Sequence, residues 1–172
     1  MKQLYFVRHG LSVLGQQGLW AGSTDTPLAD EGRTQASQAG VTARAQGLRF
    51  DVIISSPLIR AAETARLIAV ELDYPISAIE TSSLIVERDF GDLESMPWHS
   101  EYDVDAVPSA ESREALLARA QTFLDELRAR PEDTILIVSH GSFGRALRSL
   151  ISPDIPFNTK HRFENAVITE LL

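Results

Sequence analysis

The 172-residue chain has no cysteine, which excludes disulfide bonds, thiolate nucleophiles and zinc sites with cysteine ligands. No apolar run approaches the roughly 18 residues of a membrane span. The first apolar run, residues 4–7, is too short for the core of a signal peptide, so the sequence predicts a cytoplasmic protein. Hydrophobic residues make up 44% of the chain and charged residues 23%, which is typical of a globular protein and not of a disordered one. The length fits a single domain over residues 1–172.

Positive charge is scarce, since 16 basic residues stand against 24 acidic ones, for a net charge of −8. This balance argues against nucleic acid or an anionic membrane as a partner. The excess is local: residues 87–105 hold seven acidic residues and one arginine, whereas the regions before and after them are each close to neutral. A solvated acidic loop is the simpler interpretation, and an acidic border of a binding site is the alternative.

Apolar runs and helical spacings alternate along the chain. They predict strands at residues 3–7, 51–55, 134–138 and 166–172, strand candidates at 76–79 and 84–86, and helices at 30–46, 58–72, 111–130 and 141–150. Residues 9–28 and 90–108 follow neither period and are expected to be loops. The alternation predicts an α/β fold, a three-layer α/β/α sandwich with a mostly parallel central sheet. Ligands of such sheets bind beyond the carboxyl ends of the strands.

Two of the predicted strands end alike. Each apolar run is followed by one polar residue and then by His-Gly, as His9-Gly10 and as His140-Gly141. A lone histidine is more often a structural or surface residue. Two at equivalent ends of parallel strands indicate a site, where the glycines would let a ligand approach the backbone.

Two arginines are expected near the same edge. Arg8 precedes His9, and Arg60 falls early in the helix that follows the second strand. An arginine at a helix N-terminus is unfavourable against the helix dipole unless an anion is present, although Arg60 alone fits a surface residue as well. Two arginines with two histidines predict a pocket for a phosphoryl group, because guanidinium groups bind phosphate oxygens in a bidentate manner.

The tripeptide Arg8-His9-Gly10 after the first strand resembles the Arg-His-Gly motif of the histidine phosphatase superfamily, the phosphoglycerate-mutase-like family. Further segments resemble the family pattern in the same order, over nearly the whole chain: residues 22–36, 55–65, 87–94, 108–112, 138–141 and 165–169. Four positions depart from the pattern: Leu11, Gly15, Ser95 and Ala110. Gly15 stands where the family often has an asparagine in the phosphate pocket, which leaves one phosphate contact open.

The resemblance implies phosphoryl transfer through a phosphohistidine. Neutral His9 would attack phosphorus with one ring nitrogen, while an acceptor such as a backbone carbonyl fixes the other. Arg8, Arg60 and His140 would surround the phosphoryl oxygens. Glu87 would protonate the leaving group and then take a proton from the attacking water.

The resemblance also implies a set of phosphate or substrate contacts, namely Arg8, Gly10, Ser12, Gly22, Arg60, His140 and Gly141. Asp89 and Glu94 are the alternative acids, whereas His99 and His161 belong to no motif and are interpreted as surface residues. Neither a metal nor a cofactor is implied.

The leading hypothesis is a phosphomonoester phosphatase of the phosphatase branch, acting on a small phosphorylated metabolite. A phosphoglycerate mutase would use the same residues and return the phosphoryl group to the substrate. A catalytically inactive phosphate-binding module and a metal-dependent hydrolase are further alternatives. Only residues 89–109 are expected to form a lid, and a short lid favours water as the acceptor. If the acidic segment borders the site, bisphosphates and polycarboxylated phosphates should be poor substrates.

Overall fold

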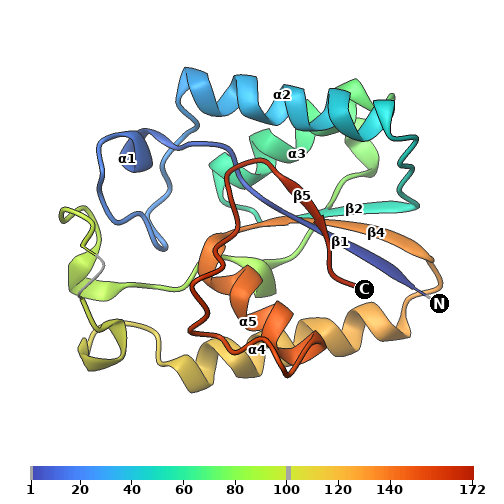
Figure 1. Ribbon diagram of the computed structural model, residues 1–172. Helices are drawn as coiled ribbons and strands as arrows, with labels where there is room; N and C mark the ends of the chain where they lie inside the picture. Colours follow the sequence, from blue (N-terminus) through green and yellow to red (C-terminus); the bar gives the residue numbers. More distant parts are fainter. Residues whose placement is uncertain (1, 100–101) are drawn as a thin grey trace.

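The computed structural model describes residues 2–99 and 102–172, and in it a five-stranded sheet lies between two layers of helices (Figure 1). The strands are β1 (Gln3–Arg8), β2 (Val52–Ser55), β3 (Glu80–Thr81), β4 (Thr134–Ser139) and β5 (Ile168–Glu170). Their order is β3-β2-β4-β1-β5, with β5 antiparallel to β1 and all other pairs parallel. The predicted three-layer α/β/α sandwich with a mostly parallel sheet is therefore confirmed.

Helices α2 and α3 cover one face of the sheet, and α4 and α5 cover the other (Figure 1). The helices are α1 (Val13–Gln16), α2 (Asp30–Ala45), α3 (Ile59–Glu71), α4 (Arg113–Ala129) and α5 (Gly141–Ile151). The four long helices lie where the sequence predicts them, with ends shifted by one or two residues. Within the described parts of the chain, no helix has both the length and the apolar character needed to cross a membrane.

Alternating side chains of the buried strands supply two cores. In β1, Leu4 and Phe6 pack toward α4 and α5, whereas Tyr5 and Val7 pack toward α2 and α3. This follows from the two-residue period of a strand, which sends successive side chains to opposite faces. Because both faces are covered, the strands read as continuous apolar runs rather than as an alternation of apolar and polar residues.

The two strand candidates before residue 90 are wrong. Residues 76–79 and 84–86 contain the 3₁₀ helices η1 (Ile76–Ala78) and η2 (Ser83–Ile85), and β3 is formed by the polar pair between them. An apolar residue here does not need a strand to be buried, because Ile85 lies in a turn and is completely buried in the core beneath α4 and α5. The strand at the C-terminus is shorter than predicted, since Ala166 has a φ of +53° that interrupts an extended chain.

The described residues of the segment 90–108 are largely irregular, as predicted, and contain the 3₁₀ turns η3 (Gly91–Leu93) and η4 (Val104–Ala106). Part of this segment pairs with the loop after α1. The backbone N–H of Trp20 donates to the carbonyl of Met96 at 2.9 Å, and that of Trp98 donates to the carbonyl of Gly18 at 2.7 Å. Two loops far apart in the sequence therefore form one continuous wall beyond the carboxyl ends of β1 and β4.

Candidate active site

The two histidines that follow β1 and β4 lie side by side. Residues Arg8 and Ser139 are register partners in the parallel pair of strands, so His9 and His140 leave the sheet at the same edge. Their ring centroids are 5.1 Å apart, and both side chains are buried. The pairing that the two His-Gly sequences predict is thus present in the fold.

The proton of His9 is fixed by the backbone. Nδ1 lies 2.7 Å from the carbonyl oxygen of Gly10, which can only accept a hydrogen bond, so Nδ1 carries the proton. Burial lowers the pKa of His9 well below its usual value, and the positive charges of Arg60 and Arg8 lower it further. The imidazole is therefore neutral near pH 7, with a lone pair on Nε2.

Arg60 lies in the first turn of α3 and is fully buried. Its Nε is 3.3 Å from Nε2 of His9, and its two terminal nitrogens donate to the carbonyls of Gly22 and Thr24 at 2.6 and 2.9 Å. Gly22 has a φ of +52°, and a Cβ there would come within 2.1 Å of the Glu94 carboxylate. The glycine is thus required by the turn that presents its carbonyl to Arg60.

Two buried donors beside His9 have no hydrogen-bond partner among the described residues, namely Nε of Arg8 and Nδ1 of His140. Nε2 of His140 lies 2.8 Å from the hydroxyl of Ser56. Burial lowers the pKa of His140 well below its usual value, so the ring is neutral and one nitrogen must accept. If the Ser56 hydroxyl donates to Nε2, the proton is on Nδ1, and both unpaired groups can then donate to an anion.

Glu87 follows η2 and places its carboxylate at the N-terminus of α5, where His140 is the N-cap. Oε1 accepts from the backbone N–H groups of Arg88, Ser142 and Phe143 at 2.9, 3.1 and 3.2 Å, whereas the only donor to Oε2 among the described residues is Ser142, at 3.2 Å. The first oxygen is committed to the helix terminus. Oε2 is the oxygen with capacity to exchange a proton.

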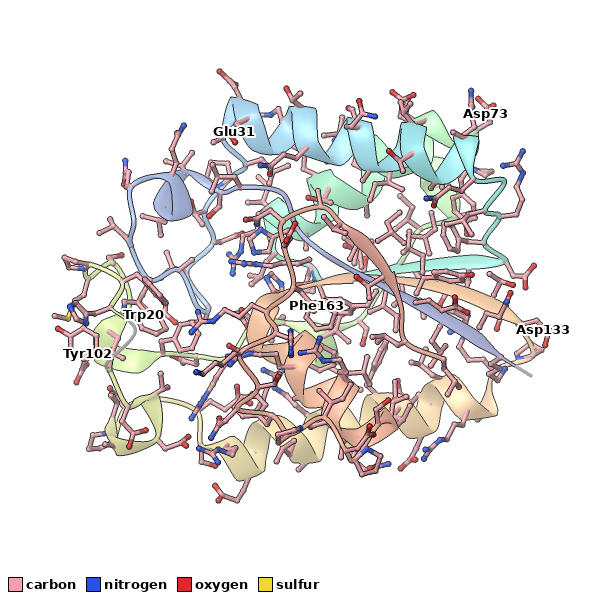
Figure 2. The ribbon with its side chains drawn as sticks, in the orientation of Figure 1. Trp20, Glu31, Asp73, Tyr102, Asp133 and Phe163 are labelled. Atoms are coloured by element: carbon pink, nitrogen blue, oxygen red, sulfur yellow. The ribbon has the colours of Figure 1, made fainter. Side chains whose placement is uncertain are left out.

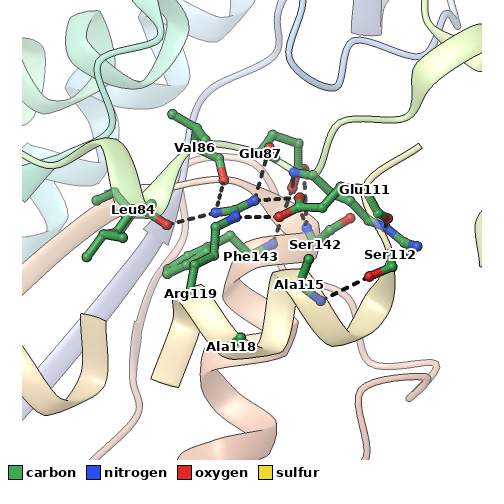
Figure 3. A network of polar contacts seen from close by, with 12 residues as sticks. Leu84, Val86, Glu87, Glu111, Ser112, Ala115, Ala118, Arg119, Ser142 and Phe143 are labelled. Carbon is green, nitrogen blue, oxygen red and sulfur yellow. Dashed lines mark hydrogen bonds and ion pairs between the residues drawn. The ribbon is translucent and has the colours of Figure 1, made fainter. Parts of the chain in front are cut away.

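The backbone that carries Glu87 is held by Arg119 of α4 (Figure 3). Its guanidinium donates to the carbonyls of Leu84, Val86 and Glu87 at 2.7, 2.8 and 3.2 Å, and pairs with both carboxylate oxygens of Glu111. Arg119 belongs to none of the motifs recognised in the sequence. The available signal was a charged side chain within the apolar stripe of α4, where it lies between buried neighbours on the same face.

Most of the predicted site residues line one cleft with a volume of about 550 Å³. They are Arg8, His9, Ser12, Gly22, Arg60, Glu87 and Gly141. Gly10 and His140 are not among the lining residues, although the ring of His140 lies 5.1 Å from that of His9. That Gly10 lets a ligand approach the backbone stays a prediction, and the structure gives this glycine a packing role as well. A Cβ there would come within 2.3 Å of the carbonyl oxygen of Gly32, so the glycine allows close packing against α2.

The two alternative acids have other partners. Glu94 accepts hydrogen bonds from the backbone and hydroxyl groups of Ser23 and Thr24. Burial alone would raise the pKa of Glu94, but these hydrogen bonds outweigh it and lower the pKa, so the group stays ionised near neutrality. Asp89 accepts from the backbone N–H of Gly91 at 2.7 Å. Neither carboxylate lines the cleft within the described part of the chain.

The mouth of the cleft holds residues that belong to no predicted motif. Trp20 and Tyr102 lie at one end of the molecule, beside the wall described above (Figure 2). His99 is exposed, as predicted, but it lies at this mouth, whereas His161 is exposed outside it. Five basic side chains also line the cleft: Arg88, Arg113, Arg145, Lys160 and Arg162. Arg88 belongs to the segment 87–94 that resembles the family pattern, whereas the other four lie outside the segments that carry the resemblance.

Several known proteins are similar to this chain in sequence and in fold. The chain is 33% identical to the protein named uncharacterized phosphatase PhoE of Bacillus subtilis over 175 residues, which cover 99% of this chain and 88% of that protein. It is 34% identical to a 2,3-bisphosphoglycerate-dependent phosphoglycerate mutase of a Bradyrhizobium species over 163 residues, 84% of this chain and 78% of the mutase. The solved structure of the Rv3214 protein of Mycobacterium tuberculosis matches with a TM-score of 0.81 and 27% identity, over 98% of this chain and 90% of that one.

The model of the histidine phosphatase superfamily, branch 1, matches residues 4–172. This range contains the paired His-Gly segments, both arginines and the glutamate at the N-terminus of α5. The chain therefore belongs to the histidine phosphatase superfamily.

Proposed function

We propose that this chain is a phosphomonoester phosphatase that acts on a small phosphorylated metabolite through a phosphohistidine at His9. The observation that carries the proposal is the state of His9. Its Nδ1 proton is held by the Gly10 carbonyl, and its Nε2 faces Arg60 at 3.3 Å. A neutral imidazole with an oriented lone pair is what attack on phosphorus requires.

In the first step, Nε2 of His9 forms a bond to phosphorus while the ester P–O bond breaks. Charge on the phosphoryl oxygens would be stabilised by Arg60 and by the unpaired donors of Arg8 and His140. The proton that the leaving alkoxide needs would come from Oε2 of Glu87. In the second step, Glu87 would take a proton from water as the water attacks phosphorus, which releases inorganic phosphate and restores His9.

A hydrolase is favoured over a mutase by the open mouth of the cleft. Lining residues such as Trp98, Tyr102 and Lys160 are exposed, which gives water access to the site. The mutase is the second candidate, because several relatives carry that name. The predicted lid at residues 89–109 stays a prediction, and residues 100–101 within it lie outside the described residues.

A rapid-quench experiment with a 32P-labelled phosphate ester tests the proposal. The wild-type protein is expected to form an acid-labile, base-stable phosphoprotein, and the His9→Ala variant is expected to form none. His161→Ala is the matched control, because His161 is exposed outside the cleft. Orthovanadate should inhibit turnover, because it adopts the five-coordinate geometry of the transition state. A phosphoprotein that persists in His9→Ala would rule out this nucleophile.

The fate of the phosphoryl group separates hydrolase from mutase. With 3-phosphoglycerate and a trace of 2,3-bisphosphoglycerate, we expect inorganic phosphate to accumulate without the 2-phospho isomer. Formation of that isomer faster than phosphate release would make the chain a mutase.

Metal independence is part of the same proposal. Among residues 2–99 and 102–172, no three histidine, aspartate or glutamate side chains are grouped so that they could hold a metal ion. Activity is expected to survive dialysis against a chelator. Loss of activity on chelation, with recovery on addition of zinc or magnesium, would overturn this part of the proposal.

A further inference from the structure

The cleft is strongly positive although the protein is negative. Its lining includes seven basic side chains, two of them the proposed phosphate ligands Arg8 and Arg60, and three acidic ones, Glu87, Asp103 and Asp105. The chain as a whole has a net charge of −8. A cleft with a local excess of positive charge attracts anionic ligands.

The acidic residues of the segment 87–105 neutralise less of the positive charge in the cleft than their number in the sequence suggests. The carboxylate of Asp105 forms ion pairs with Arg88, at 2.6 Å, and with Arg113. Asp103 accepts from the backbone N–H of Asp105 at 3.0 Å, Glu94 binds Ser23 and Thr24, and Glu101 lies outside the described residues. Of the described acidic residues in this segment, Glu87, Asp103 and Asp105 line the cleft, where seven basic side chains outnumber them. This balance favours the opposite of the expectation that bisphosphates are poor substrates.

Three cations of the cleft have no carboxylate partner within the described residues: Arg145, Lys160 and Arg162. The guanidinium of Arg145 donates to the Ser142 hydroxyl at 3.2 Å and lies 4.8 Å from the centroid of the Phe157 ring. That of Arg162 lies 5.2 Å from the centroid of the Trp98 ring. Such stacking orients a guanidinium and leaves its N–H groups available to an anion.

These cations also act on one another. Burial lowers the pKa of Arg145, and the positive charges of three neighbouring arginines lower it further, against the opposing effect of Glu87. Arg162 is among those neighbours, and its charge acts on Arg8 as well. Like charges held together beside the reacting centre repel one another, and a bound anion relieves the repulsion.

We propose that Arg145 and Arg162, with Lys160 at the rim, bind a second anionic group on the leaving-group part of the substrate. A phosphomonoester carries a charge of about −1.5 to −2 near neutrality, which Arg8 and Arg60 match. The remaining cations fit a carboxylate or a second phosphate. The inference rests on the proposed function and narrows its substrate class to phosphate esters of alcohols that carry another anion.

Three esters with closely similar primary alkoxide leaving groups test this: 3-hydroxypropyl phosphate, 2-carboxyethyl phosphate and propane-1,3-diyl bisphosphate. At low salt, we expect kcat/KM for at least one of the two acidic esters to exceed that of the hydroxypropyl ester by about 10-fold or more. The preference should shrink at high salt, because rim charges are screened. A comparison of 2-carboxyethyl phosphate with propane-1,3-diyl bisphosphate shows whether the subsite binds a carboxylate or a second phosphate.

Arg145→Gln and Arg162→Gln, alone and together, should reduce this preference, and the double variant should lose most of it. Arg162 is exposed, so its variant does not threaten the fold. Arg66→Gln is the matched control, an exposed arginine of α3 outside the cleft, and should keep the wild-type ratio. A wild-type preference for the hydroxypropyl ester, or an unchanged ratio in the double variant, would overturn the inference.

Binding to the His9→Ala variant, measured by calorimetry, separates this inference from the proposed function. The acidic esters should bind more tightly than the hydroxypropyl ester, and Arg145→Gln in the same background should reduce the difference. If no ester is hydrolysed by the wild-type protein while this binding difference persists, the phosphatase proposal fails and the anion subsite stands. Equal binding of all three esters would contradict the subsite even where hydrolysis occurs.

Discussion

At the scale of single residues, the site depends on which atom of each side chain is already held by hydrogen bonds to the backbone. The Gly10 carbonyl commits Nδ1 of His9, and three backbone N–H groups commit Oε1 of Glu87. Among the described residues, Nε2 of His9 has one polar contact, with Nε of Arg60 at 3.3 Å, and Oε2 of Glu87 accepts one hydrogen bond, from Ser142 at 3.2 Å. These less constrained atoms are the ones that a phosphoryl transfer would use. Fixing the unused atoms in advance reduces the reorganisation needed in the reaction.

A substitution at Glu87 tests the role of its carboxylate. Glu87→Gln keeps an oxygen for the helix terminus but cannot give a proton to the leaving alkoxide. We expect kcat for an alkyl phosphate to fall by roughly 10²- to 10⁴-fold, and kcat for nitrophenyl phosphate to fall far less, because nitrophenolate leaves without a proton. Steady-state kinetics on both substrates measure the difference.

Glu114→Gln is the control for that experiment, since Glu114 is an exposed glutamate of α4. It should change neither rate. Equal losses on the two substrates in Glu87→Gln would mean that Glu87 is not the proton donor.

At the scale of elements, Arg119 joins α4 to the segment that carries Glu87. Its guanidinium donates to three carbonyls of this segment, those of Leu84, Val86 and Glu87. Part of the segment forms the 3₁₀ helix η2, in place of the strand that its apolar residues predict. Glu111, just before α4, completes the contact with two oxygens. The position of the proposed acid therefore depends on a helix from a distant part of the chain.

Replacing Arg119 with leucine should leave those carbonyls and the Glu111 carboxylate without their partner. We expect a loss of about 2–3 kcal/mol in the free energy of unfolding, measured by urea denaturation. The activity of the folded variant should fall more on alkyl phosphates than on nitrophenyl phosphate, as for Glu87→Gln. A purely structural role would lower both rates alike.

The matched control is Arg128→Leu. Arg128 is on the same helix, and its ion pair with Asp125 at 3.2 Å is more than half exposed on both sides. Exposed pairs contribute little, so stability and both rates should stay close to wild type.

At the scale of the whole molecule, two buried neutral histidines link folding to pH. The pKa values of His9 and His140 are lowered in the fold, mainly by burial, so below pH 6.5 the unfolded chain binds more protons than the folded one. Stability is thus fully present above the unfolded pKa of about 6.5 and is lost as pH falls toward the folded value. Between pH 7.5 and 5.5, the lowered pKa of each histidine should reduce the free energy of unfolding by up to about 1.4 kcal/mol.

Urea denaturation at the two pH values measures this loss. In His140→Gln, whose amide can keep a contact with Ser56, the loss between pH 7.5 and 5.5 should be smaller by up to that amount. Identical losses in the variant and the wild type would mean that His140 is not held neutral in the fold.

Much of the fold and part of the site could be predicted because their causes are local. Apolar runs and helical spacing identified four of the five strands and the four long helices. The His-Gly pairs at residues 9–10 and 140–141 follow buried strands directly, so parallel pairing alone brings them together. Short edge elements were missed, since β3 is only two residues long and its pairing with β2 is not visible in hydrophobicity.

Which charged side chains lie next to one another was decided only by the tertiary structure. The sequence determined how many acidic residues the segment 87–105 contains, but the fold determined that Asp105 pairs with Arg88 and that Glu94 turns to the loop at residues 23–24. It also determined that Arg145 and Arg162 meet beside the proposed phosphate pocket. The physical reason is that electrostatic interaction depends on distance through space and on burial, and neither follows from position along the chain.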